Sequence, residues 1–299
     1  MNKKEKIVNK KILGLILLII LLLGTTYAWF TQNKNVQVTG LDVTVQTVGN
    51  LEISADGNEW GYSIEKSELE GKNEEQGEPV NYLPEELFPV STEGGHNAGK
   101  LKMFKGTVNR AEDDTYTIST SEISGDGYMA FDLFFRTEVA QTLCFSESTT
   151  VTVEDTDYGA DNAARIAIMD IANSSSGANE IKGSVYSNRG IHIFEPNSEE
   201  RVAATEAFGQ NKINYAGVNK AATDQEICYT KEENEEWPAY LTEMNTDELK
   251  GKTDIMELEP GVTKVRIVLW LEGQDVECID YVGGDKLKFN LKFTSEENN

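Results

Sequence analysis

Two segments near the C-terminus place an apolar residue at every second position, and this pattern constrains the fold more than any other feature of the chain. In residues 287–293 the apolar positions are Leu287, Phe289, Leu291 and Phe293. Residues 263–271 repeat the pattern with Val265, Ile267, Leu269 and Leu271. Successive side chains of a strand point to opposite faces of a sheet. We therefore predict two strands that pack one face in a core and turn the other face, with Lys264, Arg266 and Lys288, toward solvent.

Strand patterns also run through most of the remaining chain, at residues 36–48, 116–118, 128–137, 151–153, 165–171 and 191–194. In the first of these, the alternation changes phase at Gly40, as a β-bulge would require. Residues 128–137 are apolar on both faces, which indicates a central strand. Short strands joined by long connections are typical of an all-β domain. The leading architecture is a mainly β fold, an antiparallel β-sandwich.

Two long stretches lack strand periodicity and are interpreted as surface excursions, at about residues 56–99 and 197–250. The first is rich in Gly, Glu, Asn and Ser, and Pro84–Leu87 could open a short helix. The second is acidic and rich in Ala, with room for one or two short helices. With the leader at residues 1–30, the expected organisation is one body over residues 31–299.

The first thirty residues have the plan of an export signal. Five lysines and one glutamate stand within residues 1–11, and an uncharged run follows from Ile12 to Phe30. As a helix this run would span about 28 Å at about 1.5 Å per residue, close to the thickness of a bilayer core. Lysines stay on the cytoplasmic side, so the body is expected outside the membrane. Small residues permit cleavage between Ala28 and Trp29; a retained helix would instead anchor the protein in the membrane.

The charge balance limits the partners of this chain. It has 51 acidic and 27 basic residues among 299, a formal charge of −24. The first eleven residues contribute +4, so the remainder carries −28. Such a body repels nucleic acid and anionic lipid. The chain also lacks the glycine-rich phosphate loops of nucleotide-binding proteins. We expect no nucleic-acid or nucleotide partner.

The three cysteines, Cys144, Cys228 and Cys278, lack the spacing of a zinc site. In an exported protein they allow one disulfide, with three possible pairings, or three unpaired thiols.

The leader, whose apolar run ends in TTYAWFTQN, resembles the leaders of TasA/camelysin-type surface proteins of Gram-positive bacteria. The following VQVTGLDVTVQTV looks like their first strand, and AFDLFFRT and VRIVLWLEGQDVEC look like blocks of exported proteins with the same leader. The resemblance implies a jelly-roll-like β-sandwich at the cell surface or in the biofilm matrix, cut by a dedicated signal peptidase. It also implies self-assembly in which residues 29–48 are donated to a neighbour; alternatively, these residues form the first strand of their own sandwich.

Camelysin-type proteins have been classed as metallopeptidases, so the resemblance raises the question of zinc catalysis. The chain has two histidines, His96 and His192, and no HExxH motif. It also lacks the GxSxG motif of serine hydrolases. We expect a non-enzymatic structural or adhesive protein without a cofactor, with a metallopeptidase as an alternative.

Calcium is the ion that the composition favours. Asp155, Asp157 and Asp161 lie in the acidic loop EDTDYGADN, and clustered oxygen ligands suit a hard cation. The alternative is a solvated acidic turn.

A second alternative function is a carbohydrate-binding adhesin. Trp60 in the first excursion and Trp237 in the second could stack on sugar rings. Otherwise these rings anchor long loops to the body.

Overall fold

A computed structural model describes residues 35–297, with gaps at 47–49, 72–73, 76–77, 111–115, 156–158, 198–215, 218–226, 230–241, 244–245, 274, 276–277 and 279. The expected leader, with its cleavage residues Ala28 and Trp29, lies outside the described residues, as does most of the second excursion.

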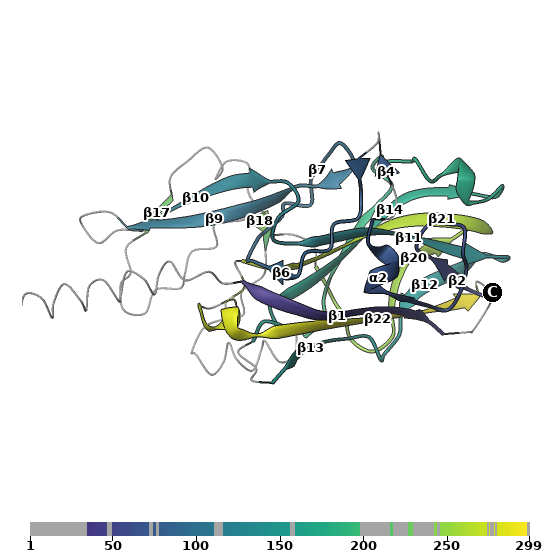
Figure 1. The fold of residues 1–299 in the computed structure, drawn as a ribbon. Helices are drawn as coiled ribbons and strands as arrows, with labels where there is room; N and C mark the ends of the chain where they lie inside the picture. The colour runs from purple at the N-terminus through teal and green to yellow at the C-terminus, as the bar shows by residue number, and fades with distance from the viewer. Residues whose placement is uncertain are drawn as a thin grey trace, which may run out of the picture. The chain divides into compact units, whose positions relative to one another are not determined.

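The described chain is mainly β, as the sequence predicts, and most of its strands belong to two large sheets (Figure 1). The seven-stranded sheet has the order β20-β12-β22-β1-β3, with β13 also paired to β22 and β6 to β1. Its strands are β1 (Val36–Val45), β3 (Ser63–Glu65), β6 (Glu86–Leu87), β12 (Gln141–Phe145), β13 (Thr150–Glu154), β20 (Thr253–Leu258) and β22 (Lys286–Glu297). The six-stranded sheet has the order β19-β15-β14-β21-β11-β2. Its strands are β2 (Glu52–Ser54), β11 (Met129–Thr137), β14 (Ala164–Ser174), β15 (Ile191–Glu195), β19 (Asp247–Glu248) and β21 (Gly261–Leu271).

Smaller elements accompany the two sheets. One three-stranded sheet joins β9 (Met103–Arg110), β10 (Tyr116–Ile123) and β17 (Ile227–Tyr229). Two-residue strand pairs are β4 (Glu74–Glu75) with β5 (Glu78–Pro79), β7 (His96–Asn97) with β8 (Lys100–Leu101), and β16 (Ala216–Gly217) with β18 (Thr242–Glu243). The helical turns are α2 (Lys66–Leu69), η1 (Ala178–Glu180) and η2 (Asp280–Gly284).

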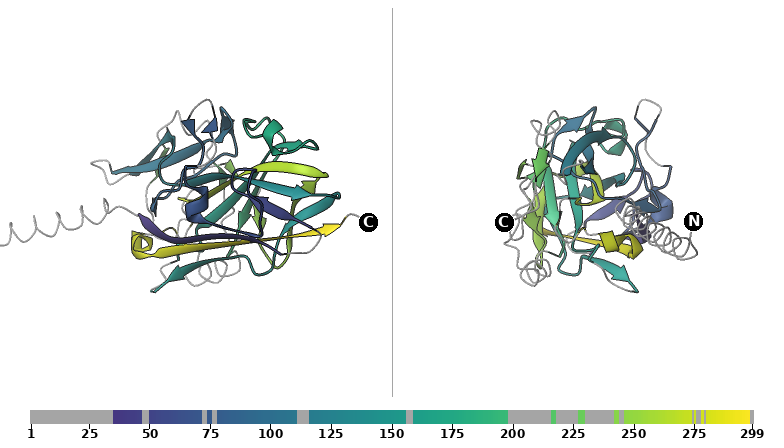
Figure 2. Two further views of the ribbon diagram at one scale, coloured as in Figure 1. Left: turned by 45° about the vertical axis from the view of Figure 1, so that its right-hand side comes forward. Right: turned by 90° about the vertical axis from the view of Figure 1, so that its left-hand side faces the viewer.

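The sheets are mixed rather than purely antiparallel, which corrects the expectation from the sequence. The first strand, β1, runs parallel to the last strand, β22, from the pair Gln37 and Lys286 to the pair Val45 and Phe293. Figure 2 shows these two strands side by side in purple and yellow. Strands β15 and β19 are also parallel. Parallel neighbours cannot be joined by a tight hairpin, and nearly the whole body separates β1 from β22 along the chain.

One hydrophobic core joins the inner faces of the two sheets. Phe135 of β11 packs edge-on against Phe293 of β22, with 5.1 Å between ring centroids. Phe145 of β12 meets Phe194 of β15 at the same separation. The apolar positions of residues 287–293 are all buried, as predicted. The predicted bulge is confirmed as well, because the β1–β22 register shifts between Val38 and Gly40.

A second core covers the outer face of the six-stranded sheet. Val90, Leu101 and Met103, which belong to the first excursion or follow it, pack there with Val268 and Trp270 of β21. The prediction that residues 264–270 turn one face to solvent is therefore wrong, because connecting segments cover that face. The prediction of a central, doubly buried strand at residues 128–137 is confirmed by β11.

The expected helix at Pro84–Leu87 does not form. Glu86 and Leu87 instead make strand β6, which pairs with Gln37 and Val36 of β1. The partner strand supplies hydrogen bonds that an isolated four-residue helix could not, since short helices are marginal without packing.

The amide of Gln141 generates a prediction about stability. This side chain is fully buried at the start of β12, and neither its Nε2 nor its Oε1 has a hydrogen-bond partner within the described residues. An unsatisfied buried polar group costs about 1–3 kcal/mol. We expect Gln141→Met to raise the free energy of unfolding by an amount of that order in urea denaturation. Gln37→Met on the exposed side of β1 is the control and should change it by less than about 0.5 kcal/mol; a destabilised Gln141→Met would contradict the argument.

Candidate functional site

Three buried charged side chains meet where β11 and β21 pair. Asp132 and Arg266 are opposite each other in the antiparallel register. The Nε atom of Arg266 donates to Oδ1 of Asp132 at 2.8 Å, and Nζ of Lys264 lies 3.0 Å from Oδ2 of the same carboxylate. All three side chains are at most 2 % exposed. A buried charge is tolerated only when it is paired and hydrogen-bonded. The outer core can therefore be buried only if the two basic side chains contact Asp132.

The same charged groups hold surface segments against the sheet. Nζ of Lys264 donates to the carbonyl oxygens of Lys182 at 2.8 Å and Ser184 at 2.9 Å. Nη1 of Arg266 donates to the carbonyl oxygen of Gly99 at 3.0 Å. Gly99 has φ +78°, and a Cβ there would lie 3.0 Å from the side chain of Val185. The 96–101 turn is therefore fixed both by charge and by a close approach that requires glycine.

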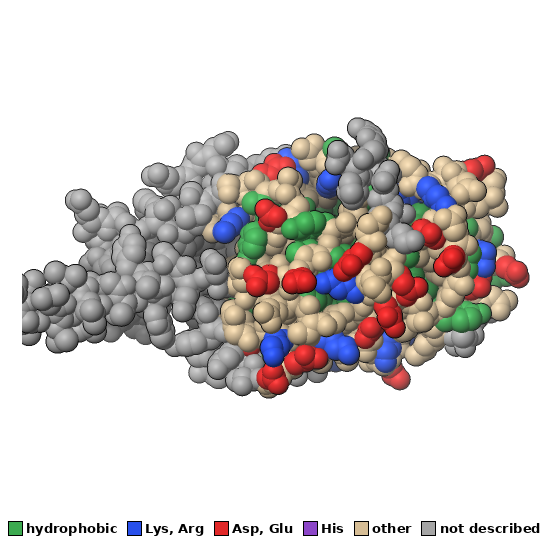
Figure 3. All heavy atoms as spheres, in the orientation of Figure 1, with side chains coloured by type: hydrophobic (Ala, Val, Ile, Leu, Met, Phe, Trp, Pro, Cys, Tyr) green, Lys and Arg blue, Asp and Glu red, His purple; other side chains and the backbone are tan. Residues whose placement is uncertain are grey.

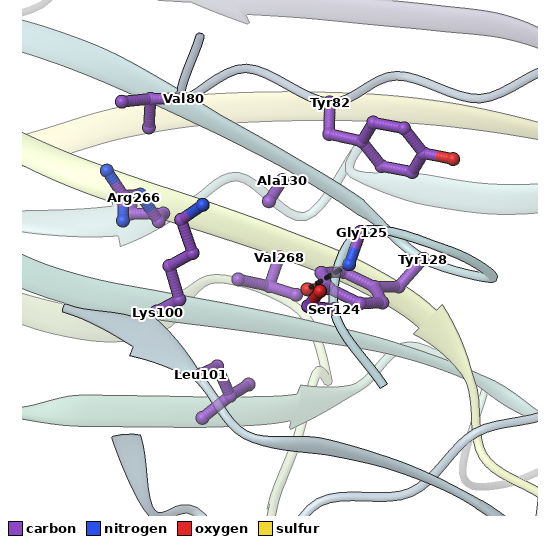
Figure 4. Close-up of a pocket in the computed structure, with 10 residues that line it drawn as sticks. All are labelled: Val80, Tyr82, Lys100, Leu101, Ser124, Gly125, Tyr128, Ala130, Arg266 and Val268. Carbon is purple, nitrogen blue, oxygen red and sulfur yellow. Dashed lines mark hydrogen bonds between the residues drawn. The ribbon is translucent and has the colours of Figure 1, made fainter. Parts of the chain in front are cut away.

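A pocket of about 220 Å³ lies beside this cluster (Figure 4). Residues from separate segments line it: Val80, Tyr82, Lys100, Leu101, Ser124, Gly125, Tyr128, Ala130, Arg266 and Val268. In Figure 4 the Lys100 side chain points across the pocket toward Ala130. The sequence did not reveal this site because its walls come from four stretches, at residues 80–82, 100–101, 124–130 and 266–268, that only the fold brings together.

The two tyrosines of the pocket have defined hydroxyl partners. The Tyr82 hydroxyl donates to Oδ1 of Asp126 at 3.0 Å, and burial first, then this hydrogen bond, raises the pKa of Tyr82. The Tyr128 hydroxyl accepts from the backbone N–H of Gly125 at 3.2 Å. Tyr82 therefore stays neutral at pH 7, and both hydroxyl groups are held in place by hydrogen bonds. On the face seen in Figure 3, acidic and basic side chains are interspersed, with small apolar groups between them.

The two histidines both lie near the 186–190 loop but form no metal site. Nε2 of His96 is 2.6 Å from Oδ1 of Asn188, and its ring packs edge-on against Tyr186 at 4.7 Å. His192 lies on β15, close to Gly190. Among the described residues, no three His, Cys, Asp or Glu side chains are grouped so that they could hold a metal ion.

The acidic loop predicted to bind calcium is only partly described. Asp155 forms an exposed ion pair with Lys286, at 2.9 Å. Asp161 is 6 % exposed, and its Oδ1 accepts from the N–H of Asn162 at 3.1 Å. Asp157 lies outside the described residues. Calcium binding at this loop stays a prediction.

One face of the Trp60 ring already contacts another side chain of this protein. The guanidinium of Arg136 lies over its ring, 4.3 Å from the centroid, and Arg136 is held in turn by Glu52 through a hydrogen bond of 2.8 Å. One ring face is therefore taken by a cation–π contact. Trp237 lies outside the described residues, so sugar stacking at these two positions stays a prediction.

Cys144 carries a free, buried thiol. Its Sγ lies 3.3 Å from Oδ1 of Asp254, and burial, followed by this hydrogen bond, raises the pKa of Cys144 to about 11. The thiol is protonated at neutral pH and is a poor nucleophile. Among the described residues, Cys278 is likewise buried and forms no disulfide, so the structure contains none of the three possible pairings.

Compared with known protein families, with curated proteins and with solved structures, the chain shows no match. The part of the chain that the structure describes has no helix whose length and apolar character would let it span a membrane.

The buried charge cluster predicts an asymmetric response to neutralisation. Asp132→Asn keeps the shape of the side chain but leaves Lys264 and Arg266 without its negative charge. Breaking a buried ion pair by removing one partner costs about 3–5 kcal/mol, and we expect that loss in urea denaturation. Asp42→Asn is the control, because the Asp42–Lys288 pair, at 3.6 Å, is nearly half exposed and such pairs contribute at most about 1 kcal/mol. Equal effects of the two substitutions would contradict the role given to Asp132.

Proposed function

We propose that this chain is an exported, non-enzymatic protein of the cell surface or extracellular matrix, with a structural or adhesive role. Its N-terminal apolar run and lysines support export, and the strongly acidic composition suits a soluble body outside the cell. The body is proposed to be a jelly-roll-like β-sandwich, a description supported by two large sheets that share one core.

The position of β1 carries the proposal of self-assembly. This strand lies inside the seven-stranded sheet, between β22 on one side and β3 and β6 on the other. All of its neighbours come later in the chain. The body therefore contains a slot for a strand, and the N-terminal segment that follows the leader fills it.

A second copy could fill the same slot with the same contacts. The bonds that β1 makes to its neighbours are mainly between backbone groups, and its apolar side chains enter the common core. Strand addition uses these two kinds of interaction. Exchange of β1 between copies therefore supports a chain of subunits.

The metallopeptidase alternative gains no support from the described residues, where His96 contacts the amide of Asn188 and the ring of Tyr186 and no three His, Cys, Asp or Glu side chains are grouped to hold a metal ion.

Export predicts that the body is reachable from outside intact cells. A membrane-impermeant amine label should modify the exposed lysines Lys286 and Lys288 in intact producing cells as fully as in disrupted ones. N-terminal sequencing of the same material should begin at Trp29 if the leader is cut and at Met1 if it anchors. Full-length protein that is soluble in the cytoplasm and labelled only after disruption would overturn the proposal.

Exchange of β1 predicts a disulfide between two chains. Thr44 of β1 and Lys292 of β22 are register partners, and neighbouring strands lie at a distance that a disulfide can bridge. We expect co-expressed Thr44→Cys and Lys292→Cys chains to form a covalent dimer, with the two peptides linked in mass spectrometry.

The matched control replaces Thr44→Cys by Gln37→Cys, because Gln37 pairs with Lys286 at the other end of the strand and cannot reach position 292. Self-assembly by strand exchange is refuted if the mixed chains stay unlinked while a Thr44→Cys/Lys292→Cys double variant closes within each chain.

A further inference from the structure

The pocket beside Arg266 has a charge character opposite to that of the chain. Its ten lining residues include two basic side chains, Lys100 and Arg266, and no acidic one, whereas the whole chain has 51 acidic against 27 basic residues. A cavity lined by one sign of charge attracts ligands of the other sign. The pocket is therefore suited to an anion.

Lys100 is the residue that can form an ion pair with such an anion. It is exposed and makes no ion pair with any residue that the structure describes. Its side chain points across the cavity rather than away from it (Figure 4). Arg266 contributes differently, because its guanidinium is already bound to Asp132 and to the carbonyl oxygen of Gly99.

The buried charge cluster also fixes the backbone position of Lys100. The Gly99 carbonyl that Arg266 holds belongs to the residue immediately before Lys100, and Leu101 after it is 4 % exposed in the outer core. The backbone on both sides of Lys100 is thus anchored, so only the side chain has to be ordered on binding. Such preorganisation lowers the entropic cost of association.

The rest of the lining selects for a small ligand with an apolar face. Val80, Leu101 and Val268 give aliphatic walls, and the rings of Tyr82 and Tyr128 close one end beside Ser124 (Figure 4). The volume of about 220 Å³ is smaller than the about 300–1,000 Å³ of sites for drug-sized molecules. It therefore accommodates a single ring rather than an oligomer.

We propose that this pocket binds a carboxylate carried on a single ring, with the Lys100 ammonium pairing to the carboxylate and the two tyrosines packing against the ring. Two sources share this chemistry, a hexuronic acid and an aromatic acid. The proposal does not depend on the role at the cell surface, because it concerns only the described pocket.

The test is calorimetric titration of the full chain in mild detergent with sodium glucuronate, sodium benzoate and glucose. We expect saturable one-to-one binding of at least one carboxylate, and binding of glucose at least tenfold weaker. Glucuronate alone would assign the ligand to acidic sugars, and benzoate alone to aromatic acids. Lys100→Gln should weaken carboxylate binding at least tenfold, whereas Lys288→Gln, which removes the same charge from β22, should leave it unchanged.

Lys100→Gln alters an exposed side chain, so circular dichroism and the urea midpoint should match those of the parent chain. The proposal is overturned if neither carboxylate binds, if glucose binds as well as glucuronate, or if Lys100→Gln and Lys288→Gln weaken binding equally.

Discussion

Burial of both faces of the six-stranded sheet is the constraint on which the rest of the structure depends. A strand that is covered on both sides cannot turn its charged residues to water, so Lys264 and Arg266 of β21 need partners inside the protein. Asp132 supplies the negative charge from the neighbouring strand. The remaining donors reach backbone carbonyls of surface segments, and those segments are thereby held against the sheet. These connections therefore have two reasons to lie against the sheet. Their backbone oxygens accept hydrogen bonds from the buried cations, and their apolar side chains are buried there.

The same arrangement recurs at a second place in that sheet. Arg165 of β14 is 1 % exposed, and its Nη2 lies 2.7 Å from Asp275 and 3.6 Å from Glu195. Glu272 is buried beside Trp270, whose Nε1 donates to it at 3.2 Å, and it also accepts from the Ser91 hydroxyl. Arg165 on β14 is matched by Asp275 on a connection, and Glu272, which directly follows β21, is matched by Ser91 on another connection. Local sequence composition cannot indicate such pairs, because the partners are about 110 and 180 residues apart.

The period of two was sufficient to predict several long strands and their inner faces, including the alternating residues of β22 and the bulge at Gly40, but it did not predict β9, β12 or β20. It could not show what covers the outer face of residues 264–270, since polar side chains at alternate positions look the same whether they meet water or a buried carboxylate. One signal was present in the sequence. Asp132 is an acidic residue within the mostly apolar strand β11, and its charge is opposite in sign to that of Arg266. The parallel pairing of β1 with β22 left no local trace at all. The pocket was equally invisible, because Tyr82, Lys100 and Tyr128 become neighbours only when the connections dock.

The burial of β1 also decides when an exchange between copies can occur. Five of its side chains, Val36, Val38, Leu41, Val43 and Val45, are at most 7 % exposed. At about 1.5–3 kcal/mol for each buried aliphatic side chain, withdrawing them costs about 7–15 kcal/mol, which matches the whole stability of a typical domain. A folded subunit would therefore have to unfold nearly completely before it gave up its first strand. Under the proposed export and self-assembly, exchange is accessible while the chain is still folding outside the membrane, when the slot between β22 and β3 has formed and either copy of β1 can enter it. On this argument, release of the N-terminus from the membrane before folding ends favours assembly, whereas a retained anchor favours closure of each subunit on its own strand.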